Sequence, residues 1–250
     1  MKISATIITL NEERNIARCI DSLVRVADEI LVMDSGSTDR TKDICLEKGV
    51  TFFHQPWLGY AKQKNCLNQK ASFDMILSID ADEEISPELE AELVSIKQKY
   101  SEGVFALNRL TNYCGTWVYH SGWYPDQKIR LFPKEMTWEG DLVHETLRMP
   151  IGIQVVMLKS HLYHYSYYSH EQHRKRADHY SSLTAMKYVQ KGKVVFIGQP
   201  VLSACIRFFS MFILKRGFLD GTQGFHIARI SAASNYFKYK EVQRLKRENN

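Results

Sequence analysis

The amino-acid sequence predicts an α/β fold, with a mostly parallel central sheet followed by a helical C-terminal appendage. Two patterns predict this fold. From residue 3 to about 100, short apolar runs alternate with segments of helical periodicity, as in parallel sheets whose strands are connected by helices. Residues 170–250, by contrast, are expected to be largely helical. The chain has 250 residues, of which 44% are hydrophobic, so it is long enough to bury a full core.

The expected strands of the parallel sheet are short apolar runs rich in β-branched residues, which is typical of strands covered on both faces. They are ISATIITL (3–10), EILVMD (29–34), VTFFHQ (50–55) and DMILSID (74–80). Three of them end in the polar stretches LNEE, MDSGSTD and SIDADEE. Because ligands of parallel sheets bind outside the carboxyl ends of the strands, these stretches are expected to line one crevice.

Segments of helical periodicity separate the expected strands. The expected helices are 11–27, 40–49, 61–71 and 86–100. The last has Ser86 as its N-cap and Pro87 at its first position, which is a common helix start. From about 104 to 165 the pattern changes to strand-like pieces with many aromatic residues, and this predicts a mixed-sheet extension suited to substrate binding.

Four carboxylates follow the fourth expected strand, at Asp80, Asp82, Glu83 and Glu84. On a regular strand, residues two apart point to the same side, so Asp80 and Asp82 are expected to face one site. Two carboxylates so close repel each other unless a cation lies beside them, and Mg²⁺ and Mn²⁺ prefer such oxygen ligands. Glu83 and Glu84 are expected to lead into the helix that begins at Ser86, where negative charge is favourable.

The stretch VMDSGSTDRT places Asp34 at a strand end, shortly before Gly36 and Ser37. Two interpretations remain open. In the first, the stretch is a tight turn in which Asp39 caps the next helix. In the second, Asp34 also accepts a hydrogen bond from a ribose or a base, and Gly36 lets the ligand approach the backbone closely.

Four motifs, in their order and spacing, resemble the inverting family 2 glycosyltransferases of the GT-A fold. They are TIITLNEERNIARCIDSL, DSGSTDRT, AKQKN and DADEE, and the resemblance covers residues 2–165. The later stretch RLFPKEMTWEGDLVHETL resembles the subgroup of lipopolysaccharide inner-core β-glucosyltransferases, which act on a core heptose. The resemblance implies a GT-A (nucleotide-diphospho-sugar transferase) catalytic domain at 1–168. Its nucleotide-binding half would be 1–100 and its acceptor-binding half 101–168.

The resemblance also implies roles for individual residues in the binding of a UDP-sugar donor. The residues expected to contact the nucleotide sugar are Thr9, Asn11, Glu12, Asp34, Gly36, Ser37, Lys64, Asn65 and Asp80. Asp82 is expected to bind a divalent cation, Mg or Mn, that bridges the donor diphosphate and offsets the charge on the leaving group. Asp80 and His164 are the other candidate metal ligands.

An inverting transfer needs a base that takes the proton of the acceptor hydroxyl. The candidates are Asp126, Glu139, Asp141 and Glu145. Glu145 is favoured because it lies beside His144 in a polar loop, and Asp126 is second. The alternative for each is an ordinary solvent-exposed loop acid. The Gln-x-x-Arg-Trp signature of processive polysaccharide synthases is absent, which argues against a polymerase.

Residues 169–250 are expected to form a helical, basic region that associates with a membrane. The net charge is +5, and the last fifty residues carry nine Lys or Arg against three Asp or Glu, so an anionic partner is expected there. The apolar run 194–214 contains Arg207, which is costly inside a bilayer, and this favours an interfacial helix over a spanning one. A core helix or a dimer contact is the alternative.

The predicted function is transfer of glucose from a UDP-sugar to a heptose of the lipopolysaccharide core. Five scattered cysteines and the lack of a signal peptide favour a cytoplasmic protein, bound peripherally to the inner face of the cytoplasmic membrane. The alternatives are another lipid-linked or polyprenyl-phosphate acceptor, a nucleotidyltransferase, or a non-enzymatic membrane adaptor with a degenerate site. The Gly-rich signature of nucleotidyltransferases is missing, and the basic residues lie on an apolar helical segment rather than in a nucleic-acid-binding motif.

Overall fold

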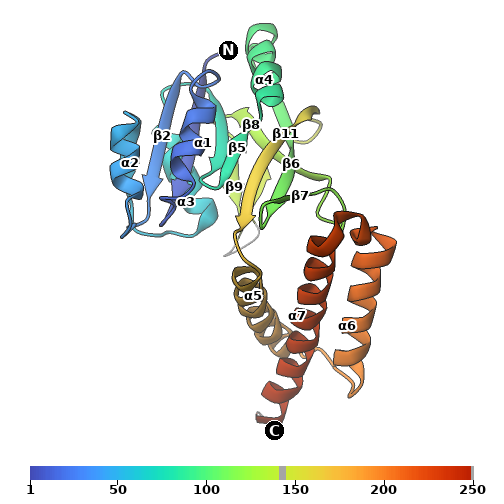
Figure 1. The fold of residues 1–250 in the computed structure, drawn as a ribbon. Coiled ribbons are helices and arrows are strands. Elements are labelled where there is room, and N and C mark those ends of the chain that lie inside the picture. The colour runs from blue at the N-terminus through green and yellow to red at the C-terminus, as the bar shows by residue number, and fades with distance from the viewer. Residues whose placement is uncertain (141–144, 249–250) are drawn as a thin grey trace. The chain divides into compact units, whose positions relative to one another are not determined.

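The computed structural model describes residues 1–140 and 145–248, and these residues form two compact units (Figure 1). Unit 1 contains Met1–Arg109 and Asp126–Tyr165. Unit 2 contains Leu110–Pro125 and the described residues from Ser166 onward. Residues 110–125, which were assigned to the acceptor-binding half, thus group with the C-terminal helices.

Unit 1 is built on a mixed sheet whose strand order is β3–β2–β1–β4–β8–β6–β11–β5. Its strands are β1 (Ile3–Thr9), β2 (Glu29–Asp34), β3 (Thr51–His54), β4 (Met75–Asp80), β5 (Glu83–Ile85), β6 (Val104–Tyr113), β8 (Asp126–Pro133) and β11 (Val155–Tyr167). The strands β1 to β4 pair in parallel, whereas β8 is antiparallel to β4 and β6, and β11 is antiparallel to β5. The predicted parallel core with a mixed extension is confirmed. A separate hairpin consists of β9 (Thr137–Glu139) and β10 (Thr146–Arg148).

Helices cover both faces of the parallel strands. They are α1 (Ile16–Leu23), α2 (Thr41–Glu47), α3 (Tyr60–Gln69) and α4 (Pro87–Lys99). Successive side chains of a strand point to opposite faces, and Ile3, Ala5 and Ile7 of β1 share a core with buried residues of α1 and α4. On the other face, the Thr6 hydroxyl donates to Asn68 Oδ1 of α3 at 3.0 Å. The sheet is therefore the middle layer of three.

The helix starts follow local capping chemistry. Ser86 caps α4 as predicted, because its Oγ accepts a hydrogen bond from the Leu89 amide at 3.1 Å. Helix α1 begins at Ile16 rather than at residue 11. The chain forms a turn before it, in which the amides of Asn15 and Ile16 both donate to the Glu12 carbonyl at 2.9 Å.

The segment 80–85 differs from the prediction. Strand β4 ends at Asp80, residues 81–82 form a turn, and Glu83–Ile85 form β5, which pairs with β11. The expectation that Asp80 and Asp82 lie on one regular strand is therefore wrong, as is the expectation that Glu83 and Glu84 simply precede a helix. The cause is the added strand pairing, which places Glu83 and Ile85 in the interior.

Unit 2 consists mainly of helices, as the sequence predicted for its C-terminal part. They are α5 (His170–Gln190), α6 (Gln199–Phe209) and α7 (Gly221–Glu248), with a π-helical turn at Ser210–Leu214 and a 3₁₀ turn at Gly217–Asp220. The strand β7 (Thr116–Val118) pairs with the end of β6. Within the described ranges, no helix combines the length and the apolarity that a bilayer-spanning segment requires.

The core of unit 2 joins the aromatic stretch before residue 125 to the C-terminal helices. Tyr113, Val118 and Met211 pack with buried residues of α7. Gly217 and Gly224 allow a close approach of two backbones, since a Cβ on Gly224 would lie 1.8 Å from the Gly217 carbonyl oxygen. A side chain at position 224 would therefore force the two segments apart.

Candidate active site

Three of the predicted site residues stand at the carboxyl ends of neighbouring parallel strands. Thr9 at the end of β1 pairs in register with Asp34 at the end of β2, and Ile8 pairs with Asp80 at the end of β4. The expected gathering of polar strand ends at one edge of the sheet is confirmed. At this edge the Thr9 hydroxyl is buried and has no hydrogen-bond partner among the described residues.

The loop after β1 is tied to the helix starts beside it. The Glu12 amide donates to Thr41 Oγ1 at 2.8 Å, and the Glu12 carboxylate accepts from Asn15 Nδ2 at 2.7 Å. Asn11 has a positive φ of 55°, and its Oδ1 accepts from the Thr38 amide at 2.8 Å. These bonds fix the loop against the turn that follows β2.

The Asp34 carboxylate is the centre of a tight turn. It accepts hydrogen bonds from the amides of Gly36 and Ser37, both at 2.9 Å, and from the Ser37 hydroxyl. Gly36 has a φ of 106°, which a residue with a side chain rarely adopts. Asp39 in turn accepts from the Thr41 amide at 2.9 Å, at the start of α2. The tight turn is confirmed, but the N-cap position of α2 is Arg40 rather than the expected Asp39, which bonds to Thr41 from one residue earlier. The ligand-binding interpretation stays a prediction.

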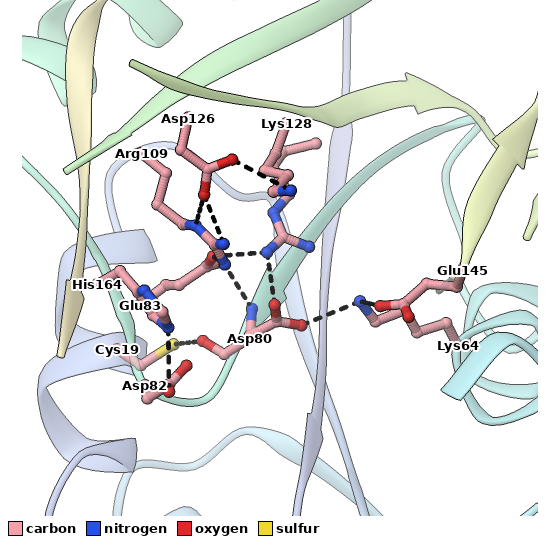
Figure 2. A network of polar contacts seen from close by, with 11 residues as sticks. Cys19, Lys64, Asp80, Asp82, Glu83, Arg109, Asp126, Lys128, Glu145 and His164 are labelled. Atoms are coloured by element: carbon pink, nitrogen blue, oxygen red, sulfur yellow. Dashed lines mark hydrogen bonds and ion pairs between the residues drawn. The ribbon is translucent and has the colours of Figure 1, made fainter. Parts of the chain in front are cut away.

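The Asp80 carboxylate lies between two cations. Lys64 Nζ is 3.0 Å from Oδ1 (Figure 2). Arg130 donates to Oδ2 at 2.5 Å. Partial burial raises the pKa of Asp80, but Arg130 and then Lys64 outweigh it and hold the pKa well below its usual range. Asp80 is therefore ionised and already neutralised by protein side chains.

A buried charge network extends from Asp80 into the antiparallel part of the sheet. Arg130 is 3% exposed and also donates to Glu83, at 2.5 Å. Arg109 contacts Glu83 at 3.3 Å and Asp126 at 2.6 Å, and its strand register pairs it with Asp126. Glu83, 1% exposed, also accepts from the Asp80 amide at 2.9 Å. Figure 2 shows Asp80, Glu83, Arg109 and Asp126 close together, and the bonds of Arg130 to Asp80 and Glu83 complete one connected cluster.

Asp82 faces a different partner from Asp80. Its Oδ2 lies 3.3 Å from His164 Nε2, on β11 (Figure 2). Burial raises the pKa of Asp82, and the neighbouring His164 outweighs this and lowers it. The two aspartates thus have different protein partners, and their sharing of one metal site stays a prediction. Among residues 1–140 and 145–248, no three potential ligand side chains lie close enough to hold a metal by themselves.

The base candidates have unlike surroundings. Glu145 Oε1 lies 3.1 Å from Lys64 Nζ, so Lys64 touches both Glu145 and Asp80. Asp126 is paired with Arg109 and with Lys128 at 3.1 Å. Burial raises the pKa of Asp126, but Arg109 and then Lys128 lower it below the usual value. Glu139 is exposed. Asp141, and also His144, which precedes Glu145, lie outside the described residues.

Asn65 is engaged by protein groups. Its Nδ2 donates to the Trp138 carbonyl and its Oδ1 accepts from the Trp138 amide, each at 2.8 Å. The carboxamide thus binds the main chain of Trp138, and the expected nucleotide contact of Asn65 stays a prediction.

Comparisons with known proteins identify the family of this chain. The model of glycosyl transferase family 2 matches residues 4–160. An uncharacterised glycosyltransferase of Rickettsia typhi is 31% identical over 255 residues, which cover 98% of this chain and 87% of the relative. The chain belongs to glycosyl transferase family 2. The lipopolysaccharide core biosynthesis glycosyltransferase LpsC of Rhizobium meliloti is 42% identical over 94 residues, 36% of this chain and 34% of LpsC.

Two solved structures are examples of those to which this chain is similar. S. aureus TarS 1–349 covers 98% of this chain and 92% of its own, at 15% identity and a TM-score of 0.48. Glucosyl-3-phosphoglycerate synthase of Mycobacterium tuberculosis, crystallised with Mn²⁺, UDP and glucosyl-3-phosphoglycerate, covers 44% of each chain at 25% identity and a TM-score of 0.37.

Sequence reasoning missed three charged residues of this glycosyltransferase. Arg109 and Arg130 lie in the apolar runs FALNRL and KIRLF, and Glu83 was assigned to a helix start. A signal was present, because a single charge inside a buried strand requires a buried counter-charge. The partner could not be named, since Glu83 and Arg130 are 47 positions apart.

Replacement of Glu83 tests the buried network of the glycosyltransferase. Glu83→Gln leaves Arg130 without its full counter-charge, so we expect a loss of about 3–5 kcal/mol in the free energy of unfolding. Glu84→Gln is the matched control. Its ion pair with Arg18 is partly exposed, and we expect a loss of about 1 kcal/mol or less. Urea-induced unfolding measures both, and equal losses would contradict the assignment of Glu83.

Proposed function

We propose that this family 2 glycosyltransferase transfers glucose from UDP-glucose to a heptose of the lipopolysaccharide core, with inversion at the transferred carbon. The observation that carries the proposal is the meeting of Asp80 and Glu145 on one buried cation, Lys64. A donor-side carboxylate and a candidate base then lie within reach of each other, as acceptor activation requires. The partial similarity to LpsC supports the acceptor class.

The nucleotide is proposed to bind at the carboxyl ends of β1 and β2. The residues proposed to surround it are Thr9, Asn11, Glu12, Asp34, Gly36 and Ser37, with Lys64 and Asp80 beside them. The unpartnered Thr9 hydroxyl supports this, because a buried polar atom normally has a hydrogen-bond partner and a ligand can supply it. Gly36, whose φ is 106°, adds a stretch of backbone that carries no side chain of its own.

A divalent cation, Mg²⁺ or Mn²⁺, is proposed to be held by Asp82 and His164. A carboxylate oxygen and an imidazole nitrogen suit this role, and such cations often bind one or two protein ligands together with substrate phosphates. The two side chains, 3.3 Å apart, fit a site of this kind. Asp80, which already contacts two cations, is proposed to serve the nucleotide. When bound, the cation would stabilise the charge that develops on the leaving diphosphate.

Glu145 is proposed as the catalytic base. Its carboxylate takes the proton of the acceptor hydroxyl while the hydroxyl oxygen bonds to the sugar C1 and the bond from C1 to the diphosphate oxygen breaks. Asp126 is less suited because two cations, Arg109 and Lys128, hold its carboxylate and lower its pKa, whereas Glu145 contacts Lys64 alone among the described ion pairs. A second acceptor class, a polyprenyl phosphate or another lipid-linked saccharide, would use the same residues and is separated by the acceptor assay below.

Unit 2 is proposed to bind an anionic membrane surface at the inner face of the cytoplasmic membrane. Between Asp178 and Asp220 the chain contains no acidic residue. The large apolar side chains exposed on and around α6 include Phe196, Ile197, Leu202, Ile206, Phe209 and Leu214. Arg207, Lys215 and Arg216 are exposed among them. Apolar side chains flanked by basic ones suit the boundary between acyl chains and anionic headgroups.

Replacement of Asp82 tests the cation site. We expect Asp82→Asn to weaken Mn²⁺-dependent UDP binding by at least about 10–100-fold. Removal of a residue that only supports a metal ligand already causes a loss of this size. Asp43→Asn, which removes an exposed acid from α2, should bind normally. Calorimetric titration with UDP, with and without Mn²⁺, measures the difference. Wild-type binding that a chelator leaves unchanged would contradict a cation site.

Replacement of Glu145 tests the proposed function as a whole. With UDP-glucose and a heptose-terminated core acceptor, we expect Glu145→Gln to lower turnover about 10²–10⁴-fold while UDP binding is retained. Glu139→Gln, an exposed acid of the same hairpin, is the matched control. Product formation measures turnover for a panel of UDP-sugars and for core or polyprenyl-phosphate acceptors. Near-normal turnover of Glu145→Gln would contradict its role as base.

The membrane surface has its own test. We expect Arg207→Gln to weaken binding to vesicles that contain phosphatidylglycerol by about fivefold, since each basic residue near an anionic surface contributes about 1 kcal/mol. Arg174→Gln, which removes an exposed arginine from α5, is the control. Co-sedimentation with vesicles measures binding. Equal binding to vesicles with and without the anionic lipid would contradict an electrostatic contribution.

A further inference from the structure

Two neighbouring residues of α3 hold the hairpin that leads to Glu145. Asn65 bonds to both main-chain groups of Trp138, donating to the carbonyl and accepting from the amide, each at 2.8 Å. A side-chain carboxamide thereby satisfies a main-chain donor and acceptor, as a neighbouring strand would. Helix α3 is thus fastened to the middle of β9.

The Trp138 side chain fixes the same strand a second time. Its ring is buried and packs edge-on against Phe132 of β8, with ring centroids 5.6 Å apart. Lys64 Nζ lies 4.9 Å from the centre of the Trp138 ring. The strand β9 is therefore held by its main chain and by its side chain, from α3 and from the central sheet.

This anchoring bears directly on Glu145. In the hairpin, Trp138 pairs with Leu147 and Glu139 pairs with Thr146, the residue that follows Glu145. The two strands have three residues each, and so short an isolated hairpin is marginally stable in water. Its position therefore depends on outside contacts, and Asn65 supplies two of them.

Lys64 completes the arrangement from the adjacent position. Its Nζ, on a side chain 3% exposed, contacts Glu145 Oε1 at 3.1 Å and Asp80 Oδ1 at 3.0 Å. One turn of α3 therefore sets the place of the hairpin through Asn65 and the direction of the Glu145 carboxylate through Lys64.

We propose that Asn65 is a positioning residue for acceptor activation, which acts by clamping Trp138 and thereby placing Glu145. The inference rests on the proposed role of Glu145 as base. A displacement of about 1 Å at a reacting group can cost about 100-fold in rate. We expect the clamp to affect the chemical step rather than donor affinity, because Nδ2 and Oδ1 of Asn65 are both directed at Trp138.

The test uses Asn65→Ala in the full-length protein, with Gln69→Ala as the matched control because it removes an exposed carboxamide from the same helix. We expect Asn65→Ala to lower kcat by about 10–100-fold while the KM for UDP-glucose and the affinity for UDP stay unchanged. Hydrogen exchange at the Trp138 amide should become faster, since this amide loses its acceptor. The control should match the wild type in all three measurements.

Asn65→Asp provides a second variant that keeps the clamp's acceptor and removes its donor. Its Trp138 amide should remain protected while kcat still falls, because the carboxylate faces the Trp138 carbonyl without a proton to share. This variant also serves if Asn65→Ala does not fold. Unchanged kcat in the folded variants would overturn the proposal, and so would weaker UDP binding with unchanged kcat, which would make Asn65 a nucleotide ligand.

Glu145→Gln, measured in parallel, separates this proposal from the one on which it rests. Full turnover of Glu145→Gln would remove Glu145 as base, whatever Asn65 does. Loss of turnover in Glu145→Gln together with normal kcat in both Asn65 variants would keep the base and overturn the clamp. A merely structural role of Asn65 would lower the melting temperature without separating kcat from KM, and this outcome would also count against the proposal.

Discussion

The burial of the Arg130 guanidinium is the constraint on which the rest of the site depends. A cation that is 3% exposed cannot remain unpaired, because the loss of hydration costs several kcal/mol. Glu83 and Asp80 neutralise it, each at 2.5 Å. Since Arg130 belongs to β8 and its partners to β5 and the end of β4, this one requirement joins the parallel and antiparallel parts of the sheet.

The same requirement separates the roles of the carboxylates. Asp80 is ionised, and Arg130 and Lys64 balance its charge. It can therefore accept hydrogen bonds from a polar ligand without a change of its own protonation. Asp126 is drawn into the network by Arg109, which weakens it as a base. Asp82 remains outside the network with His164 as its partner. Three aspartates that look alike in sequence thus differ in what they can do.

Helix α3 connects this charge balance to the acceptor side. Lys64 belongs to both, since it contacts Asp80 and Glu145 from one buried position. Asn65 holds one strand of the hairpin whose two strands flank Glu145 in the sequence. This short helix has little apolar periodicity. Ala61 and Leu67 pack into the core, whereas Lys64 and Asn65 serve the site.

By itself, the sequence determined the alternation of strands and helices, the gathering of Thr9, Asp34 and Asp80 at one edge, and membership of glycosyl transferase family 2. These follow from local periodicity and from the order of motifs along the chain. Only the tertiary structure decided that Glu83 is buried and that Asp80 and Asp82 face different partners. It also decided that Asn65 hydrogen-bonds to the main chain of Trp138. The direction of a side chain at a turn, and the counter-charge of a buried group, depend on residues that pairing brings together from distant positions.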